Sequence, residues 1–436
     1  MNVGVVGLWH LGTVTAACLA AAGHTVVAVD TEAVVAPLAA GEVPVAEPGL
    51  AELVAAQRTA GRLEFGSDLT ALRVCELVWI TYDTPIDAFD CADVEFVVER
   101  IRAVIDCLDE SATIAVSSQL PVGSVARLER IAAAAGKSGS LTFASIPENL
   151  RLGSAIAYFR TPDRMIVGVR DTLARERIAR MLAPFVADVK WMRTESAEMT
   201  KHALNGFLAT SVAFMNEIGA VCERVGADAR EVEIGLKSDV RIGPKAYLRA
   251  GQAFAGGTLA RDLAFLAAIG ERTGVGVEQL TATQASNQRH KDWLAATVGA
   301  ALAGSGEPAV ALLGLVYKPG TDTLRASTAL ELARRLREAG VRVSGFDPAI
   351  AVGRGELAGI VDVAVSAAAA LLDADVAVVA TPWPAFRDLR AADFAGMRGR
   401  TLVDPDRFLD PAHAALSGLT YVAFGVGAPD AAVAHS

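Results

Sequence analysis

The N-terminal part of the chain alternates between short apolar runs and longer stretches with the length of a helix. Residues 3–6 (VGVV) and 25–29 (TVVAV) are apolar runs, and a glycine-containing turn and a helix-like stretch that ends at Gly23 lie between them. More apolar runs follow, separated by helical stretches, at residues 77–81, 113–117 and 141–145. This alternation predicts a parallel sheet with helices on both faces.

The pattern changes near Thr194. The segment ESAEMTKHALNGFLATSVAFMNEIGAVCERVG has helical periodicity, and Gly226 marks the expected end of this long helix. More helical segments continue to about Val298. The small residues at 300–308 (AALAGSGEP) are typical of a linker.

Beyond this linker the first pattern returns, and the segment AGVRVSGFD, which ends at Asp347, resembles AGHTVVAVD near the start. The repeat consists of a strand, a loop, a helix and a second strand, at residues 310–313, 314–322, 327–339 and 341–346. We therefore expect an α/β protein in which two Rossmann-like parallel-sheet domains, residues 1–193 and 301–436, flank a central helical domain at 194–300.

Composition narrows the classes of function. The 436 residues are 52% hydrophobic and 21% charged, so the chain can bury a large core. A net charge of −10 argues against general binding to nucleic acids or anionic membranes. The sequence has no apolar run of about 18 residues, and its start lacks the basic region of a signal peptide, so we expect a cytoplasmic protein.

Cysteine and histidine usage gives no sign of a disulfide framework or a metal site. The five cysteines are odd in number and have no CxxC spacing. The six histidines are scattered and lack metal-ligand spacing. We therefore predict no bound metal.

The turn after the first strand is the first candidate site. Gly7, Trp9, His10, Leu11 and Gly12 lie between a strand and a helix, where a dinucleotide-binding turn places its glycines. The next strand ends at Asp30, whose carboxylate could accept the ribose hydroxyls of NAD and would repel the 2′-phosphate of NADP. These features predict NAD as the cofactor; the alternative is a sharp turn that binds no nucleotide.

Three further positions could contribute chemistry. Lys201 and Asn205 share one face of the long helix, where they could move a proton or hold a hydroxyl group; the alternative is an ordinary solvated face. Glu148 follows a strand, at the edge where ligands bind α/β sheets; the alternative is an acid at a helix N-terminus.

A glycine-rich basic stretch, RIGPKAYLRAGQAFAGGTLARDL, is the next candidate. Its glycines expose backbone N–H groups, and it contributes positive charge to an acidic chain, which suits a diphosphate. The cations are Arg241, Lys245, Arg249 and Arg261. The alternative is an ordinary flexible loop.

Several motifs occur in a fixed order along nearly the whole chain. The first half contains EPGL at 47–50, Thr84-Pro85, PVG at 121–123 and Pro147-Glu148. The second half contains EMTKHALNGFLAT at 198–210, RIGPKAYL at 241–248, GLVYKPGTDTLRAS at 314–327 and ATPWPAF at 380–386. In this register the chain resembles the UDP-glucose/GDP-mannose dehydrogenases.

The resemblance implies oxidation of a nucleotide-sugar C6 hydroxymethyl group to a carboxylate with two NAD, and a homodimer built on the long helix. The implied catalytic residues are Lys201, Asn205, Asp262, Glu148 and Thr258. The implied cofactor-binding residues are Gly7, Trp9, His10, Leu11, Gly12, Asp30, Thr84, Pro85 and Arg325. The implied substrate-binding residues are Glu148, Asn149, Leu150, Lys201, Asn205, Arg241, Lys245, Tyr247, Leu248, Gly256, Gly257, Tyr317 and Lys318.

Four positions depart from the family pattern. Thr258 stands where the family has the cysteine that traps the aldehyde intermediate, because AFAGGTLARD occupies the place of GFGGSCFPKD. Gln119 replaces a usual threonine, Leu152 a usual glutamate, and Trp9 the central glycine of the turn. A hydroxyl is a far weaker nucleophile than a thiolate near neutral pH.

These departures lead to three hypotheses about function. The first is an NAD-dependent oxidoreductase that acts on C6 of a nucleoside-diphosphate hexose, with a UDP-sugar as the expected substrate. It stops at the 6-aldehyde or epimerises C5 without net oxidation. The second is a full four-electron UDP-glucose 6-dehydrogenase. The third is a nucleotide-sugar-binding protein without activity.

Overall fold

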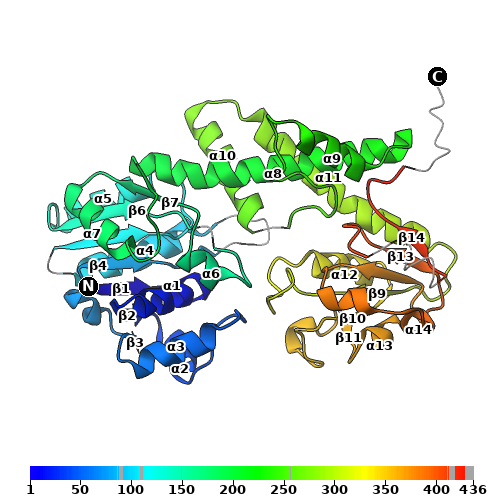
Figure 1. Ribbon diagram of the computed structural model, residues 1–436, viewed down its shortest axis with the longest axis horizontal. Helices are drawn as coiled ribbons and strands as arrows, with labels where there is room; N and C mark the ends of the chain where they lie inside the picture. Colours follow the sequence, from blue (N-terminus) through cyan, green and yellow to red (C-terminus); the bar gives the residue numbers. More distant parts are fainter. Residues whose placement is uncertain are drawn as a thin grey trace. The chain divides into compact units, whose positions relative to one another are not determined.

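The computed structural model describes residues 1–85, 87, 92–108, 111–148, 150–255, 257–409, 411 and 418–427. The chain forms two compact units, Met1–Leu204 and Asn205–Ser436. The boundary between them falls within the long helix α8 (Thr194–Val225), which Figure 1 shows in green. Asn149 and Gly256, two of the expected substrate-binding residues, lie outside the described residues.

The first unit is an eight-stranded sheet in the order β3-β2-β1-β4-β5-β6-β7-β8. All neighbouring strands are parallel except β6 and β7, which pair antiparallel. The strands are β1 (Asn2–Val6), β2 (Thr25–Val29), β3 (Leu63–Gly66), β4 (Leu77–Ile80), β5 (Ala112–Val116), β6 (Leu141–Ser145), β7 (Met165–Val169) and β8 (Val189–Met192). The five apolar runs of the sequence correspond to β1, β2, β4, β5 and β6.

Helices cover both faces of this sheet, as predicted (Figure 1). Neighbouring strand residues belong to different cores: Val5 packs with α1 and α7 on one face, and Val6 packs with α4 and α5 on the other. Burying a side chain of this size contributes about 1.5–3 kcal/mol. The helices are α1 (His10–Ala21), α2 (Glu32–Ala39), α3 (Leu50–Thr59), α4 (Val94–Cys107), α5 (Ser124–Ala134), α6 (Ala155–Arg160), α7 (Thr172–Leu182) and the 3₁₀ helix η1 (Leu69–Val74).

The second unit combines a group of helices with a six-stranded parallel sheet in the order β11-β10-β9-β12-β13-β14. After α8, the helices are α9 (Ala229–Ser238), α10 (Thr258–Thr273) and α11 (Glu278–Ala301). The strands are β9 (Ala309–Leu313), β10 (Arg342–Phe346), β11 (Asp362–Val363), β12 (Val376–Val379), β13 (Thr401–Val403) and β14 (Thr420–Val422). The remaining helices are α12 (Thr328–Glu338), α13 (Ala367–Leu371), α14 (Ala391–Phe394), η2 (Gly355–Leu357) and η3 (Pro384–Asp388).

The internal repeat predicted from the sequence is visible in the strand order. The first six strands of the N-terminal sheet and the six of the C-terminal sheet follow the same 3-2-1-4-5-6 connectivity. The turn after the first strand also repeats, with Gly7 at φ +97° and Gly314 at φ +96°. A Cβ atom at Gly7 would lie 2.6 Å from the backbone N of Tyr82, and one at Gly314 would lie 2.6 Å from that of Thr381. Both turns therefore require glycine.

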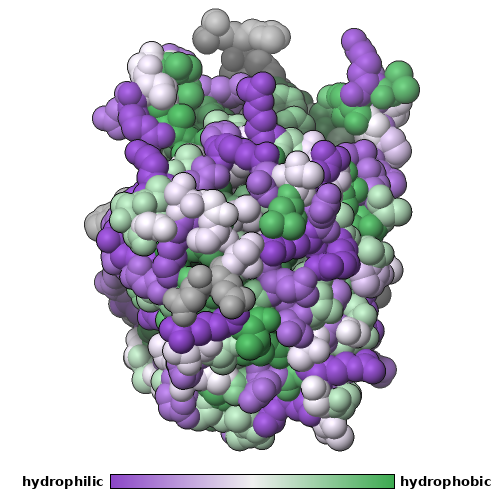
Figure 2. All heavy atoms as spheres, turned by 90° about the vertical axis from the view of Figure 1, so that its left-hand side faces the viewer, coloured by the Kyte–Doolittle hydropathy of each residue, from purple (hydrophilic) through white to green (hydrophobic). Residues whose placement is uncertain are grey.

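Within the residues that the structure describes, no helix combines the length and the apolar character needed to cross a bilayer. On the face drawn in Figure 2, hydrophobic side chains occur as scattered groups among hydrophilic ones, which is common on protein surfaces.

Candidate functional site

The glycine turn of the first unit has the close packing of a dinucleotide-binding turn. Gly7 follows β1, and α1 begins three residues later at His10. A Cβ atom at Gly12 would lie 1.9 Å from the carbonyl oxygen of Gly7, so the helix can approach the strand this closely only without a side chain there. The turn therefore brings the N-terminal amides of α1 to the carboxyl edge of the sheet, where helix N-termini bind phosphate.

Asp30 holds this turn in place. One carboxylate oxygen accepts the backbone N–H of Leu8 at 2.6 Å, and the other accepts that of Thr31 at 2.7 Å. A carboxylate has about four acceptor sites, so these two bonds do not use its full capacity. The residue is half-buried, and its position at the end of β2 matches the one expected for contact with a ribose.

Trp9 and His10 follow the turn in different environments. Trp9, at the N-cap of α1, is 36% exposed. His10 is buried, and its Nε2 lies 2.9 Å from an oxygen of Glu47. The neighbouring Leu11 is half-buried.

Glu47, part of the EPGL motif, links this histidine to another segment. Its two oxygens accept the backbone N–H groups of Gly153 at 2.7 Å and Ala155 at 2.8 Å, at the start of α6. The sequence analysis assigned no role to Glu47. The contact identifies it as a buried acceptor that joins the segment after Glu148 to the start of α1.

Thr84 and Pro85 follow β4 at the same edge of the sheet. The hydroxyl of Thr84 is buried and donates to the backbone oxygen of Gln119 at 2.7 Å. The carbonyl of Pro85 accepts the N–H of Asp93 at 2.8 Å. The bond of Thr84 joins the loops after β4 and β5, two adjacent strands of the sheet, whereas that of Pro85 lies within the connection between β4 and α4.

Glu148 and Lys201 meet in the first unit. The ammonium group of Lys201 donates to the backbone oxygen of Glu148 at 2.7 Å, and the carboxylate of Glu148 accepts the N–H of Leu150 at 2.7 Å. The alternative interpretation of Glu148 as an acid at a helix N-terminus is wrong, because the next helix, α6, begins only at Ala155. Lys201 is half-buried rather than fully solvated.

Glu198, in the same motif as Lys201, has a structural environment that the sequence did not reveal. Its carboxylate accepts the N–H groups of Gly123 at 2.7 Å and Val125 at 2.9 Å, at the N-terminus of α5. Burial raises the pKa of Glu198, and these two backbone donors partly oppose the increase. One turn later, buried His202 contacts the backbone oxygen of Leu120 at 3.0 Å. Thus the EMTK and PVG motifs are joined by side chain to backbone contacts.

In the second unit, Asn205 and Asp262 form a buried pair. The side-chain amide of Asn205, on α8, donates to a carboxylate oxygen of Asp262, on α10. Asn205 is 5% exposed and Asp262 is 0% exposed. The alternative of an ordinary solvated helix face is therefore wrong for Asn205.

Thr258 is the first residue of α10 and is exposed. It follows Gly257, whose φ of +90° favours glycine. A Cβ atom at Gly257 would lie 3.8 Å from the Cβ of Ala326, so the start of α10 lies beside the loop that follows β9. Ala326 has a φ of +56°, which is unusual for a residue with a side chain.

The basic stretch before α10 is largely exposed. Arg241 forms an ion pair with Asp239 at 2.7 Å, and Lys245 and Tyr247 are also exposed, whereas Leu248 is half-buried. Arg261 differs from the expectation, because it is buried in α10 rather than part of an accessible loop.

Tyr317, Lys318 and Arg325 belong to the loop between β9 and α12 in the second unit. The N–H of Tyr317 donates to the carbonyl of Thr323 at 2.9 Å, which closes the loop. Burial raises the pKa of Tyr317, and the phenol of Tyr247 adds to the increase. Arg325, expected among the cofactor-binding residues, is exposed in the same loop as Lys318.

Cys222 is the one cysteine in the sequence of the second unit, and it lies on α8 about 25 Å along the helix from Asn205. The described residues contain no cluster of three or more His, Cys, Asp or Glu side chains that could hold a metal ion.

Comparison with known proteins gives matches to three family models. The NAD binding domain of the UDP-glucose/GDP-mannose dehydrogenase family matches residues 1–186, its central domain 195–289 and its UDP binding domain 311–411.

Relatives match over nearly their full lengths. The UDP-glucose 6-dehydrogenase of Pseudomonas aeruginosa is 36% identical, with 99% of this chain and 98% of the relative covered. The UDP-glucose 6-dehydrogenase of Rhizobium meliloti is 34% identical, with 99% and 100% covered. Among solved structures, a UDP-glucose dehydrogenase from Pyrobaculum islandicum has a TM-score of 0.88 at 30% identity, with 98% of each chain covered.

Proposed function

The chain belongs to the UDP-glucose/GDP-mannose dehydrogenase family, and on this premise we propose that it oxidises C6 of UDP-glucose to the carboxylate with NAD as the oxidant. The observation that supports this proposal most strongly is the 36% identity, over nearly the whole of both chains, to a UDP-glucose 6-dehydrogenase. The comparisons thus favour the four-electron activity, which the sequence analysis held as the alternative. The three-domain division at residues 193 and 300 is part of the same proposal.

The first unit fits the cofactor. The absence of a Cβ atom at Gly7 and Gly12 lets the turn pack closely against Tyr82 and lets α1 approach the turn, and Asp30 places a carboxylate at the end of β2. These residues would hold the pyrophosphate and the adenosine ribose of NAD. When bound, NAD supplies the hydride acceptor for oxidation at C6.

In the first unit, Lys201 is the proposed proton-handling residue. Its ammonium group is held at the backbone oxygen of Glu148, beside the carboxyl edge of β6. A positioned cation of this kind can stabilise the alkoxide that develops at C6 as hydride leaves.

In the second unit, the buried pair of Asn205 and Asp262 is proposed to orient water or the sugar hydroxyl, because the amide fixes the direction of the carboxylate. The exposed cations Arg241 and Lys245, together with Lys318, are proposed to bind the diphosphate.

Thr258 determines how the second oxidation can proceed. A thiol would trap the aldehyde covalently, but a threonine hydroxyl at this position is not deprotonated near neutral pH. We propose that water adds to the aldehyde instead. The resulting hydrate loses a hydride from C6 to a second NAD and a proton to water, which leaves the carboxylic acid.

A second candidate function is favoured by Thr258 itself. If hydration is slower than release, the reaction ends at the 6-aldehyde after one hydride transfer. The aldehyde also acidifies the C5 proton, so loss and return of that proton followed by return of the hydride would epimerise C5 without net oxidation.

Product analysis in deuterated water separates these activities. With UDP-glucose and NAD, the proposal expects two NADH and one carboxylate per sugar. One NADH with an aldehyde, or deuterium at C5 without net NADH, would replace it with the second candidate. Binding of UDP-glucose with no turnover at all would indicate a protein without activity.

The Thr258→Cys variant tests the route. We expect the thiol to accelerate the second oxidation by tenfold or more (about 1.4 kcal/mol per factor of ten) relative to wild type, because it adds a nucleophile that is partly ionised at neutral pH. Thr258→Ser is the matched control, since it keeps a hydroxyl, and its rate should stay near that of wild type. A covalent intermediate in wild-type protein, detected by intact mass, would contradict the hydrate route.

We also propose that the chain forms a homodimer through α8. Phe207, Phe214 and Val221 are exposed by 67%, 46% and 56%, and they recur every seven residues, so they form one apolar stripe along the helix. A stripe of this kind on a 32-residue helix is suited to packing against a second helix.

A further inference from the structure

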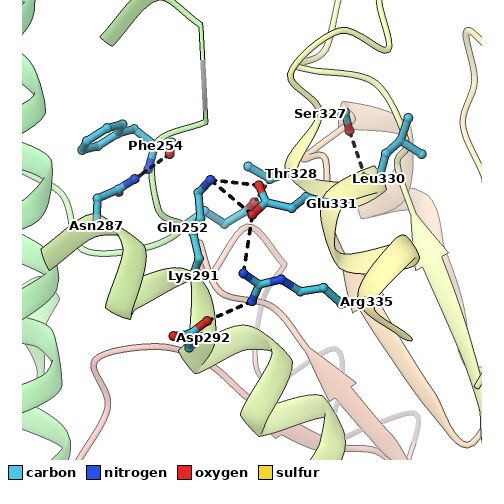
Figure 3. Close-up of polar contacts among 10 residues, drawn as sticks. All are labelled: Gln252, Phe254, Asn287, Lys291, Asp292, Ser327, Thr328, Leu330, Glu331 and Arg335. Atoms are coloured by element: carbon cyan, nitrogen blue, oxygen red, sulfur yellow. Dashed lines mark hydrogen bonds and ion pairs between the residues drawn. The ribbon is translucent and has the colours of Figure 1, made fainter. Parts of the chain in front are cut away.

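The segment that precedes Thr258 is held in place by side chains from other elements of the second unit. The N–H of Gly251 donates to Asn216 Oδ1 on α8 at 3.0 Å, and the carbonyl of Gly251 lies 2.6 Å from His290 Nε2 on α11. The backbone N–H of Phe254 donates to Asn287 Oδ1 on α11, and the carbonyl of Phe254 accepts from Asn287 Nδ2, both at 2.9 Å (Figure 3). These bonds attach the segment to the central helices.

A different set of bonds attaches the same segment to the C-terminal sheet, and its centre is Asp406. One carboxylate oxygen accepts the backbone N–H of Gln252 at 2.9 Å, and the other accepts the side-chain amide of Gln252 at 3.0 Å. Asp406 approaches so closely that a Cβ atom at Gly251 would lie 2.2 Å from its Oδ1. Burial raises the pKa of Asp406, while the backbone donor of Gln252 opposes the increase.

The side-chain amide of Gln252 spans the carboxyl edge of this sheet. Its nitrogen donates both to Asp406, which follows β13, and to the carbonyl of Ala380, which follows β12, at 3.0 Å. Its oxygen accepts the hydroxyl of Thr328, the first residue of α12, at 3.1 Å. Ligands of α/β sheets bind at this edge, so Gln252 connects the segment to the part of the sheet that faces a ligand.

The backbone of Asp406 is fixed as well. Its carbonyl accepts Arg249 Nη2 at 2.8 Å and Arg230 Nη2 at 3.1 Å. Arg249 lies two residues beyond Tyr247, in the basic stretch proposed to bind the diphosphate. Asp406 therefore contacts both the basic stretch, through Arg249, and the segment before α10, through Gln252.

This arrangement has a consequence for Thr258, which lies six residues beyond Gln252. Gly257 and Thr258 follow the anchored segment, and Gly257 lies beside Ala326 in the loop that contains Lys318. The position of Gln252 thus affects how Thr258 is presented to the diphosphate-binding loop. We propose that Asp406 is a positioning residue that, through Gln252, holds the start of α10 against the C-terminal sheet and so sets the affinity for the nucleotide sugar.

This inference rests on the proposed function, and the pair offers a reciprocal test. In Asp406→Asn, the new amide would face the donating amide of Gln252. In Gln252→Glu, two carboxylates would face each other. The double variant restores one donor and one acceptor between the two side chains and has the same net charge as the wild-type pair, but its carboxylate at position 252 cannot donate to the carbonyl of Ala380.

We expect each single variant to raise KM for UDP-glucose about tenfold, equivalent to about 1.4 kcal/mol, with kcat changed by less than about threefold. The double variant should recover part of the loss, because the contact between the two side chains is restored while the bond to Ala380 is not. Gly251→Ala should resemble Asp406→Asn, because its Cβ displaces the same carboxylate. Asp388→Asn, at an exposed aspartate of the same unit, is the matched control and should behave as wild type.

Hydrogen exchange provides a readout that needs no substrate. The backbone N–H of Gln252 should exchange faster in Asp406→Asn than in wild type. It should regain protection in the double variant. Unchanged exchange and unchanged KM in the single variants, or no recovery in the double variant, would overturn the inference. If wild-type protein neither binds nor oxidises UDP-glucose, the proposed function fails, whereas the exchange pattern still decides the role of Asp406.

Discussion

At the scale of single residues, Asp30 after β2 and Asp347 after β10 occupy equivalent positions in the two sheets but have different environments. Asp30 is half-buried and accepts two backbone N–H groups. Asp347 is 1% exposed, and its carboxylate accepts from four donors: the N–H groups of Leu315, Val316 and Ala349 and the indole of Trp383. The two carboxylates therefore differ in their capacity to accept hydrogen bonds from a ribose, which favours the first sheet as the NAD-binding one.

This difference leads to a prediction about cofactor choice. Wild-type protein should bind NAD more tightly than NADP. Asp30→Asn should weaken NAD binding about tenfold and reduce the difference in affinity between NAD and NADP, because the negative charge is lost while the side chain keeps its size. Isothermal titration with both cofactors measures this. Asp188→Asn, at an exposed aspartate of the same unit, is the control. Tighter binding of NADP by wild-type protein would show that Asp30 does not select the cofactor.

The chemistry at single residues could be predicted only in part. Sequence spacing placed Lys201 and Asn205 on one helix face but could not indicate their partners, Glu148 and Asp262, which lie 53 and 57 residues away. For the same reason the roles of Glu47 and Glu198 as acceptors of backbone N–H groups were not predicted. A buried carboxylate has no local pattern in the sequence that distinguishes it from a solvated one.

At the scale of elements, α8 combines structural and candidate catalytic residues within two turns. Glu198 and His202 contact the segment at 120–125, whereas Lys201 contacts the loop after β6. The start of this helix therefore contacts both the segment that follows β5 and the loop that follows β6. Part of the EMTK motif is explained by this packing alone.

We expect Glu198→Ala to destabilise the chain by about 1–3 kcal/mol, because two N–H groups at the start of α5 lose their acceptor. The raised pKa of Glu198 means that the folded state binds a proton where the unfolded state, with a pKa near 4.5, has lost it. This contribution to stability is complete below the unfolded pKa and is lost as the pH rises through the folded pKa. The penalty of the substitution should therefore be larger near pH 4.5 than near pH 7.5.

Urea unfolding at the two pH values measures this penalty. Glu176→Ala, at an exposed glutamate on α7, controls for general effects of charge removal. An equal penalty at both pH values would contradict the expected linkage.

Three strands of the N-terminal sheet were not predicted from the sequence, and two of them share a physical reason. β3 and β8 are the two edges of the N-terminal sheet and are only partly buried, so their sequences, LEFG and VKWM, lack a continuous apolar run. β7 (MIVGV) is apolar and lies between β6 and β8, and its antiparallel pairing with β6 differs from the fully parallel sheet that was predicted.

At the scale of the whole molecule, the duplicated sheets could be predicted because each copy retains the same local order of strand, glycine turn, helix, strand and acid. The bonds between Gln252 and Asp406 could not be, because 154 residues separate them and neither lies in a regular element with a periodic pattern. The architecture follows from local sequence patterns, whereas the fixing of the proposed substrate-binding segment depends on contacts between distant parts of the chain.

The exposed stripe on α8 leads to the last prediction, about assembly. Wild-type protein should be a dimer, and Phe214→Asp should shift it to monomers, because a charge at the centre of a buried apolar stripe loses its water without gaining a partner. Analytical ultracentrifugation measures the shift. Leu173→Asp, at another large apolar residue that is 42% exposed, is the matched control and should leave the dimer intact. A monomeric wild-type protein would show that the stripe on α8 does not mediate self-association.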